Sequence, residues 1–365
     1  MIIMGKIREN DKVFLPAIAI PPGESIKEYL EIFKMTQSEL AIRLGITPKH
    51  LVSMLKGNTS ITYETALKLE RVIGPSAEFW INLESNYQLD KARIEEEQKL
   101  KEDYEVLKDI PYNDMSKLGW VDKTTNKNER VKNSRQFFRV SSLTSIARSC
   151  SVAFRMNKTK NNVSDYGVLA WLNEAEILGS KVETEQFNRN KLKNYIDEFR
   201  KLTLQNPEKF YPKMVQLCLE CGVALVLVES LPRTYICGAT IWKGENPIIA
   251  LSVRGKKADI FWFTFFHELA HIIKHNRKQM HINYENDPQE CEADELARNY
   301  LIDEQIYDCF IKKYDYANPL QIKLYAESIG IAPCILVGRL LHDKLIEYGK
   351  VYENLRPSFK IVKHQ

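Results

Sequence analysis

The run Phe266-His-Glu-Leu-Ala-His271 contains the residue types that hold a metal ion and activate a water molecule. Residues four apart lie on one face of a helix, so His267 and His271 can direct ring nitrogens at the same ion. Glu268 is offset around the helix and can reach a water beside the ion as a general base, without being a ligand. The spacing therefore predicts metal-dependent hydrolysis.

The alternative to a metal site is a helix that carries two surface histidines by chance. Here the motif overlaps the apolar run Phe261-Trp-Phe-Thr-Phe-Phe266, so the helix is expected to be buried. Buried imidazole and carboxylate groups are costly unless something satisfies them, and this favours metal binding. His275 lies one turn further along, where we expect a solvated helix end rather than a group that stabilises an oxyanion.

A third ligand is expected from residues 290–301, which read Glu-Cys-Glu-Ala-Asp-Glu-Leu-Ala-Arg-Asn-Tyr-Leu. Glu290 and Asp294 are four apart, so one can bind the ion while the other orients a histidine ring from behind. We favour Glu290 as the ligand, with Glu292 as the alternative, and we expect Glu295 to be solvated. The donor types predict Zn²⁺, although manganese or iron could also occupy two histidines and one glutamate.

The elements around this motif alternate between helix and strand. A helix is expected over residues 214–221, ending at Gly222, and is followed by buried strands at 223–228, 235–242 and 248–251. The apolar metal helix then covers residues 259–275, and helices follow at 288–302 and 304–313. As a sheet edge, the strand 235–242 could bind an extended peptide by strand addition.

Residues from about 213 to 345 resemble the ImmA/IrrE metallo-endopeptidase family. The likeness lies in the strand before the metal helix, the run Phe263-Thr-Phe-Phe-His-Glu-Leu-Ala-His271 and the Glu-x-Glu-Ala-Asp segment after it. The resemblance implies a zincin-like α+β domain in which zinc is held by His267, His271 and Glu290, with Glu268 as catalytic base. The family usually has an apolar pair followed by Met-Pro where this chain reads Leu301-Ile302-Asp303, a departure that concerns packing. Residues 325–340 resemble a second, degenerate helix-turn-helix, for which we expect a packing role.

Near the N-terminus, residues 25–89 read as a run of short helices. Thr36-Gln-Ser-Glu39 is a capping box in which hydroxyl and carboxylate each reach the other's backbone N–H. Gly45 is expected to end that helix in a left-handed conformation, and Thr47-Pro48 starts the next one. The second helix is expected to bury Leu51, Val52 and Leu55. Two helices joined by a tight glycine turn form a helix-turn-helix.

The segment from Glu24 to Leu89 resembles the XRE-type DNA-binding domain in its HigA-antitoxin form. The residues that carry the likeness are Pro22-Gly-Glu24, Thr36-Gln-Ser-Glu-Leu-Ala41, Leu44-Gly-Ile46, Leu55-Lys-Gly57, Ala66-Leu-Lys-Leu69 and Glu78-Phe-Trp-Ile-Asn-Leu83. In such a motif the first residues of the second helix reach base edges. The residues expected to meet DNA are Gln37, Thr47, Lys49, His50, Ser53 and Lys56.

No acidic residue lies between Thr47 and Asn58, so this surface can approach phosphates. Paired half-sites in a double-stranded operator would favour a homodimer. The alternative is a helix-turn-helix used only for protein contacts, because the net charge of +4 over 365 residues neither demands nor excludes nucleic acid.

The expected elements and the two resemblances predict a mainly helical protein with a small β-sheet. We expect a helix-turn-helix domain at 1–90, a charged linker and mostly helical region at 91–210, and the metallopeptidase domain at 211–365. Seven cysteines, an odd number, favour a reducing cytoplasm over a secreted disulfide framework. Cys218 and Cys221 have CxxC spacing, but no second pair completes a metal site, so packing is the preferred interpretation. No stretch approaches the roughly 18 apolar residues of a membrane span.

Two functions follow from these observations. The first is a DNA-binding regulator that also cleaves a protein substrate. The second is an antitoxin-type DNA-binding module with a cognate toxin, whose metallo-domain binds protein or is structural. Glu268 favours the first, since a structural zinc site needs no base.

Overall fold

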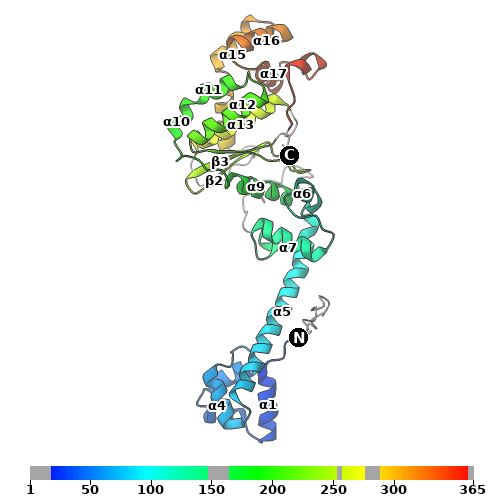
Figure 1. The fold of residues 1–365 in the computed structure, drawn as a ribbon, viewed down its shortest axis with the longest axis vertical. Coiled ribbons are helices and arrows are strands. Elements are labelled where there is room, and N and C mark those ends of the chain that lie inside the picture. Colours follow the sequence, from blue (N-terminus) through cyan, green and yellow to red (C-terminus); the bar gives the residue numbers. More distant parts are fainter. Residues whose placement is uncertain (1–17, 147–163, 253–256, 276–287, 361–365) are drawn as a thin grey trace, which may run out of the picture. The chain divides into compact units, whose positions relative to one another are not determined.

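The computed structural model describes residues 18–146, 164–252, 257–275 and 288–360. The chain divides into two compact units, Met1–Tyr104 and Glu105–Gln365, and the boundary lies within helix α5, Ala77–Asp109. Helices dominate, with one three-stranded sheet in the second unit (Figure 1), so the predicted fold class is confirmed. The finer division into 1–90, 91–210 and 211–365 stays a prediction.

The first unit packs four short helices and the start of α5 around one core. The helices are α1 Pro22–Ile32, α2 Gln37–Leu44, α3 Pro48–Leu55 and α4 Tyr63–Ile73. Leu40, Leu51 and Trp80 are fully buried in this core. The backbones of α1 and α3 approach closely, because a Cβ atom placed on Gly23 would lie 2.1 Å from the carbonyl oxygen of Leu55.

The predicted ends of α2 and α3 are confirmed. The Thr36 hydroxyl accepts a hydrogen bond from the Glu39 amide, the Thr47 hydroxyl accepts one from the His50 amide, and Gly45 has a φ of 65°. Only half of the expected capping box forms, since the Glu39 carboxylate accepts hydrogen bonds from Arg43 instead.

The expected burial of Val52 is wrong. Val52 is 39% exposed, whereas Met54 is 1% exposed and fills the core beside Leu51 and Leu55. A helix of only eight residues buries a narrow stripe, and the stripe of α3 falls on 51, 54 and 55.

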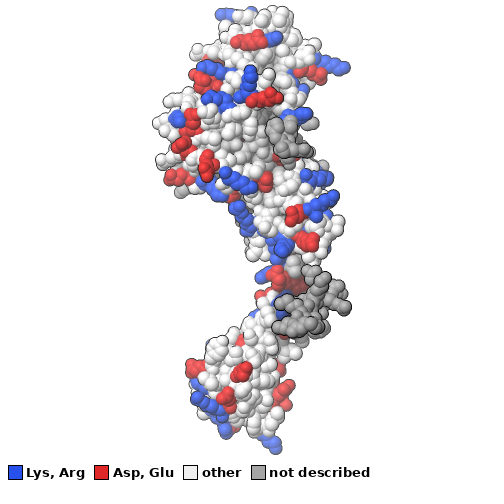
Figure 2. Space-filling model, viewed as in Figure 1, with Lys and Arg blue, Asp and Glu red and all other residues white. Residues whose placement is uncertain are grey.

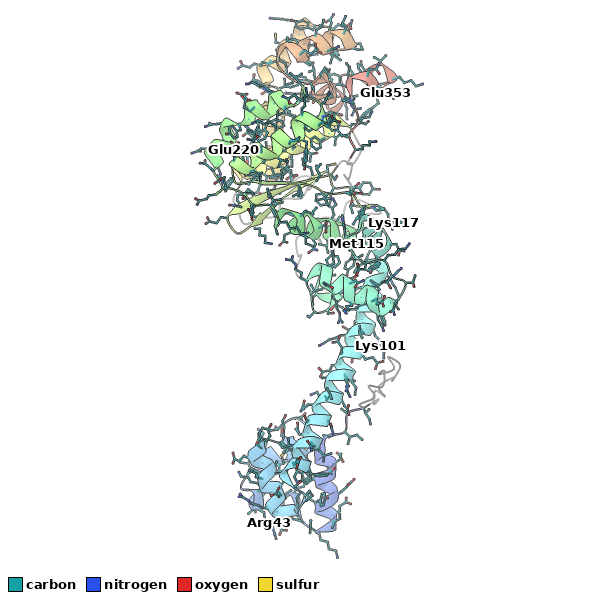
Figure 3. The ribbon with its side chains drawn as sticks, viewed as in Figure 1. Arg43, Lys101, Met115, Lys117, Glu220 and Glu353 are labelled. Atoms are coloured by element: carbon teal, nitrogen blue, oxygen red, sulfur yellow. The ribbon has the colours of Figure 1, made fainter. Side chains whose placement is uncertain are left out.

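Residues 91–109, which read in the sequence as a solvated helix or a linker, form the second half of α5, in which Asp103 and Leu107 are buried. Lys101 projects outward from it (Figure 3) and pairs with the exposed Glu97 one turn earlier. Pairs of this kind add only a few tenths of a kcal/mol each to a helix.

The region before the sheet is mostly helical, as predicted. Its helices are α6 Tyr112–Leu118, α7 Lys127–Phe138, η1 Leu143–Ser145, α9 Asp165–Gly179, α10 Arg189–Asn194 and α11 Ile196–Leu202. Residues 191–204 have the apolar spacing of a helix, and in the structure they belong to two helices, α10 and α11, that meet at Tyr195.

The sheet has three strands in the order β1-β3-β2. They are β1 Ala224–Leu227, β2 Gly238–Lys243 and β3 Asn246–Leu251. β3 pairs in parallel with β1 and antiparallel with β2, through a tight turn in which Gly244 has a φ of 63°. The predicted strand at 235–242 begins later than expected, at Gly238.

Both faces of the sheet are covered. Alternate side chains point to opposite faces of a strand, so Val226 and Ala250 pack against α9, while Leu225 and Ile249 pack against the core that contains α13. Helices α12 Pro207–Glu220 and α13 Ala258–Lys274 lie on the side opposite α9 (Figure 1).

α13 is the centre of the second unit. It packs against β2 and β3, and also against α14 Pro288–Leu301 and α17 Pro333–His342. The remaining helices are α15 Glu304–Lys313, α16 Pro319–Ser328 and η3 Lys350–Leu355. The Asp303 carboxylate, in the segment that departs from the ImmA/IrrE pattern, caps the start of α15 by accepting from the amides of Gln305 and Ile306.

Within the described ranges, no single helix is long and apolar enough to cross a membrane; α16 and α17 reach that threshold only when counted together across a bend of 119°.

Candidate metal centre

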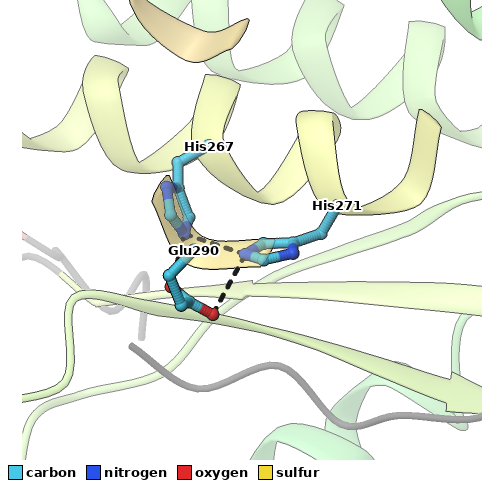
Figure 4. A group of neighbouring side chains, drawn as sticks. All are labelled: His267, His271 and Glu290. Carbon is cyan, nitrogen blue, oxygen red and sulfur yellow. Dashed lines mark hydrogen bonds and ion pairs between the residues drawn. The ribbon is translucent and has the colours of Figure 1, made fainter. Parts of the chain in front are cut away.

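The two motif histidines and Glu290 meet at one point (Figure 4). The Glu290 carboxylate lies 3.2 Å from His267 Nε2 and 3.3 Å from His271 Nε2, and the two ring nitrogens are 3.0 Å apart. Ligands about 2.1 Å from a tetrahedral zinc ion are separated by about 3.4 Å. The three donors therefore fit a single divalent ion, and imidazole nitrogen with carboxylate oxygen is a donor set that suits zinc.

All three side chains are buried: His267 is 4% exposed, His271 1% and Glu290 6%. Two come from consecutive turns of α13 and the third from the first turn of α14. Burial in this apolar core removes competing water and holds the rings in place, which favours a preorganised site.

The electrostatics of the cluster favour a cation. Burial alone would lower the pKa of His267, but hydrogen bonds with Asp294 and Glu290 outweigh it and raise that pKa to about 10. Burial would likewise raise the pKa of Glu290, yet hydrogen bonds with His267 and His271 lower it to about 2. The cluster thus stabilises positive charge at the histidines, which is where a metal ion would sit.

Asp294 holds the back of one histidine. Its carboxylate lies 2.8 Å from His267 Nδ1, the ring nitrogen that faces away from Glu290. The structure therefore brings Asp294 to the position expected for the orienting carboxylate, while Glu295 is exposed as expected.

His275 contacts the other histidine, His271, on the side of the ring away from Glu290. The prediction that His275 lies at a solvated helix end is therefore wrong. His275 is 7% exposed, and its Nδ1 lies 3.0 Å from His271 Nδ1. Its Nε2 lies 3.1 Å from Glu292, which also pairs with Lys274. Glu292 is therefore brought to His275 and Lys274, whereas Glu290 is the α14 carboxylate that meets the two ring nitrogens of the cluster.

Glu268 lies in a tight space between α13 and β2. It is 2% exposed, and its Oε2 accepts a hydrogen bond of 2.7 Å from the Thr240 hydroxyl. Burial raises the pKa of Glu268. A Cβ atom on Gly238 would lie 2.5 Å from the Thr264 methyl carbon and 2.9 Å from Glu268 Oε1.

Thr240 and Gly238 were missed by the sequence analysis. Both lie on the face of β2 that meets α13, two residues apart in a strand whose other inward positions are apolar. The sequence does show a glycine and a hydroxyl residue two positions apart in a predicted strand. It does not show their partner, because Glu268 lies 28 residues further along the chain from Thr240.

The CxxC cysteines lie elsewhere, in the core around α12. Both are free thiols and fully buried. Burial raises the pKa of the Cys221 thiol to about 11 and that of Cys218 well above its usual value. Thiols kept protonated in an apolar core agree with the packing interpretation.

The residues expected to meet DNA lie on α2, α3 and their ends. Gln37, Lys49, His50 and Lys56 are exposed, and no carboxylate in the described ranges pairs with either lysine. Ser53 is half-buried and its hydroxyl lies 2.7 Å from that of Thr59. Figure 2 shows acidic and basic side chains interspersed on the visible face of this unit, so any basic surface here is local.

Comparison with known proteins divides the chain in the same way. Residues 26–80 match the family model described as helix-turn-helix, and residues 224–325 match the IrrE N-terminal-like domain. The chain is 35% identical over 71 residues to the HTH-type transcriptional regulator YddM of Escherichia coli, covering 20% of this chain and 76% of that protein. It is 35% identical over 75 residues to virulence-associated protein I of Dichelobacter nodosus, covering 20% and 69%.

A solved structure of an addiction module antidote protein of the HigA family from Coxiella burnetii matches 23% of this chain and 94% of that one, at 34% identity and a TM-score of 0.22. The two family models, 26–80 and 224–325, coincide with the helix-turn-helix core and with the elements that hold the metal cluster. The chain therefore belongs to the helix-turn-helix family of DNA-binding regulators through its N-terminal unit, and it carries an IrrE-like peptidase domain in its C-terminal unit.

Proposed function

We propose that this protein is a DNA-binding regulator whose second unit is a zinc-dependent endopeptidase that cleaves a protein partner. The observation that carries the proposal is the buried cluster of His267, His271 and Glu290 with the Glu268 carboxylate beside it. A structural site needs only ligands, so a second carboxylate, held separately from the three donors, points to chemistry.

In this proposal His267, His271 and Glu290 hold the zinc ion. A bound Zn²⁺ supplies Lewis acidity and makes a nearby water easier to deprotonate. Thr240 holds Glu268 Oε2, which leaves Oε1 to take a proton from the attacking water and return it to the leaving amine. Because burial raises the pKa of Glu268, the carboxyl can both accept and release a proton closer to neutral pH.

The substrate we propose is an extended segment of protein. β2 stands at one end of the strand order and carries both Gly238 and Thr240, which contact Glu268. A peptide that adds to this edge by backbone hydrogen bonds would pass the general base with its carbonyl groups in register.

The test is metal analysis together with a search for cleavage products. Purified wild type should contain one zinc per chain, Glu290→Ala should lose it, and Glu268→Gln should retain it. Proteins from cells that produce the wild type should show new N-termini that are absent with Glu268→Gln. Glu295→Gln, an exposed change on the same helix as Glu290, is the matched control and should behave as wild type.

Equal product patterns from the wild type and Glu268→Gln would contradict the mechanism. One zinc per chain with no cleavage at all would instead support the alternative, an antitoxin-type regulator whose metallo-domain binds a cognate toxin or is structural.

For the first unit we propose that α3 enters the major groove of a double-stranded operator, with Lys49, His50 and Lys56 facing DNA. Thr47 caps α3 and so has its hydroxyl engaged, and Ser53 is engaged with Thr59, so these two contribute less directly. A homodimer on paired half-sites and a cytoplasmic location remain parts of the proposal.

A further inference from the structure

A cavity of about 540 Å³ opens beside the metal centre. It is lined by residues of α13, α14, α17 and the C-terminal segment, and it reaches from His267 to the ion pair between Asp259 and Arg356. Eight residues of helix separate Asp259 from His267, which corresponds to about 12 Å. Volumes of this size hold small organic ligands or large side chains with their neighbours.

The walls of the cavity are mainly apolar. The apolar side chains that line it are Ile260, Phe263, Leu301, Ile302, Ile335 and Leu341. Surfaces of this kind gain from contact with an aliphatic or aromatic group, at roughly 25 cal/mol for each Å² removed from water.

The three arginines and three acidic residues of the lining balance in formal charge, but among the described residues Arg298 and Arg339 lack the close carboxylate partner that Arg356 has in Asp259. Arg298 donates from Nε to the carbonyl oxygen of Asp294, and no carboxylate in the described part of the chain pairs with its guanidinium. Arg339 stacks on Tyr307 and donates to the Ile302 carbonyl, while its buried Nε has no hydrogen-bond partner and lies 4.0 Å from Asp343. Burial lowers the pKa of Arg339, and the nearby charge of Arg298 lowers it further.

Each acidic side chain on the cavity wall already has a partner, although one oxygen of Asp259, Oδ1, accepts no hydrogen bond within the described residues. Both hydrogen bonds from Arg356 go to Asp259, and Glu290 and Asp294 face His267. Among the described residues, Arg298 is therefore the lining arginine without a carboxylate partner, in a cavity with mainly apolar walls.

We propose that this cavity binds a carboxylate joined to an apolar body, with the carboxylate paired to Arg298 and the apolar part against α13 and α17. One source of such a group is an acidic residue of a peptide, a case that rests on the proposed peptidase function. The other source is a free carboxylate that binds beside the metal site. Both have the same chemistry, so binding can be tested without cleavage.

The probe is 4-phenylbutyrate, and its uncharged amide, 4-phenylbutanamide, is the matched compound. Isothermal titration of the full-length protein, freed of metal by a chelator, should show that the acid binds at least about tenfold more tightly than the amide. Arg298→Gln should remove this preference, and Arg298→Lys, which keeps the charge, should restore much of it. Lys312→Gln, an exposed change on α15 that removes the same charge, should leave it intact.

Equal affinity for acid and amide, or no binding of either at millimolar concentration, would overturn the proposal. So would binding that appears only after zinc is restored, because the carboxylate would then be coordinating the ion. The arginine and lysine variants must first melt at the wild-type temperature, and the lysine variant keeps the test valid where the glutamine variant does not fold.

A second titration separates the two sources. A capped peptide Ac-Phe-Glu-Phe-NH₂ that binds more tightly than Ac-Phe-Gln-Phe-NH₂, in wild type but not in Arg298→Gln, identifies a peptide side chain as the occupant. Binding of 4-phenylbutyrate alone identifies a free carboxylate. Because both titrations are done without zinc and can be repeated on Glu268→Gln, failure of the cavity and failure of the peptidase proposal give different results.

Discussion

At the scale of single residues, each histidine of the candidate metal cluster has a polar side chain against its Nδ1 atom, on the side of the ring away from Glu290. Asp294 stands behind His267, and His275 stands behind His271 with Glu292 behind it in turn. If the ion occupies Nε2 of His271, the proton of that ring stays on Nδ1 and is donated to His275, whose own proton then points at Glu292. In that arrangement Asp294 and His275 would fix the ring tautomers that leave both Nε2 atoms free to bind.

Removing the contact of His275 with His271 should weaken metal binding without removing a proposed ligand. His275→Phe keeps a ring of similar size but loses both nitrogens, so we expect the zinc dissociation constant to rise about 10–100-fold. His275→Gln, which can still donate and accept, should lose less. Competition with a chromophoric chelator measures the zinc affinity, and Glu295→Gln is the control. Equal affinities for His275→Phe and wild type would show that His275 contributes only to packing.

The residues of the cluster could be predicted from sequence because i and i+4 spacing places His267 with His271, and Glu290 with Asp294, on shared helix faces. The role of His275 could not, although it continues the same spacing. Its partner Glu292 belongs to another helix, and the burial of a helix end depends on what packs over it. A histidine at a helix end therefore reads as solvated until the neighbouring helix is known.

At the scale of elements, β2 positions Glu268, the proposed general base, through the hydroxyl of Thr240. The sequence predicted three strands and the apolar helix after them, because buried runs and turn residues mark each one. It did not predict the order β1-β3-β2, because strand order is a long-range property that no local pattern contains. The contact of Thr240 with Glu268 depends on that order.

Gly238 is the point at which this contact is most easily disturbed. Gly238→Ala places a methyl group against Thr264 and Glu268 Oε1, so we expect a loss of stability of about 1–3 kcal/mol and a displaced carboxylate. Zinc content should stay at the wild-type level while cleavage falls, since the ligands lie on α13 and α14. Denaturant unfolding measures the stability, and metal analysis measures the zinc content. The control is Gly244→Ala in the turn between β2 and β3, where an added Cβ atom would meet nothing within 4 Å. This variant strains the backbone without displacing Glu268.

At the scale of the whole molecule, two compact units carry two separate sets of functional residues. Local caps and glycine turns predicted the first unit well, because short helices are determined by nearby residues. The middle helices matched no family in the sequence analysis, and only their helical periodicity was predictable. Their packing against the sheet, through α9, required the structure.

The first unit should lose DNA affinity when the charge of α3 is reversed. Lys49→Glu with Lys56→Glu replaces two unpaired cations, so the slope of log affinity against log salt should fall by about two. Operator fragments selected from genomic DNA and titrated at several salt concentrations measure this. The control is Lys101→Glu with Lys108→Glu on α5, which changes net charge equally; the same loss in both double variants would mean that α3 is not the contact surface.

The order of the elements along the chain has a consequence for synthesis on the ribosome. Everything that packs the helix-turn-helix core lies before residue 104, whereas α13 is buried by α14 and by α17, which ends at His342. Because domains fold as units while the chain grows at about 5–20 residues per second, a nascent chain completes its DNA-binding module tens of seconds before its metal helix is covered. α13 itself is complete at Lys274, so until α14 and α17 follow, only the earlier elements β2, β3 and α10 can cover its apolar surface, and we expect chaperones to bind newly made chains most strongly at that stage.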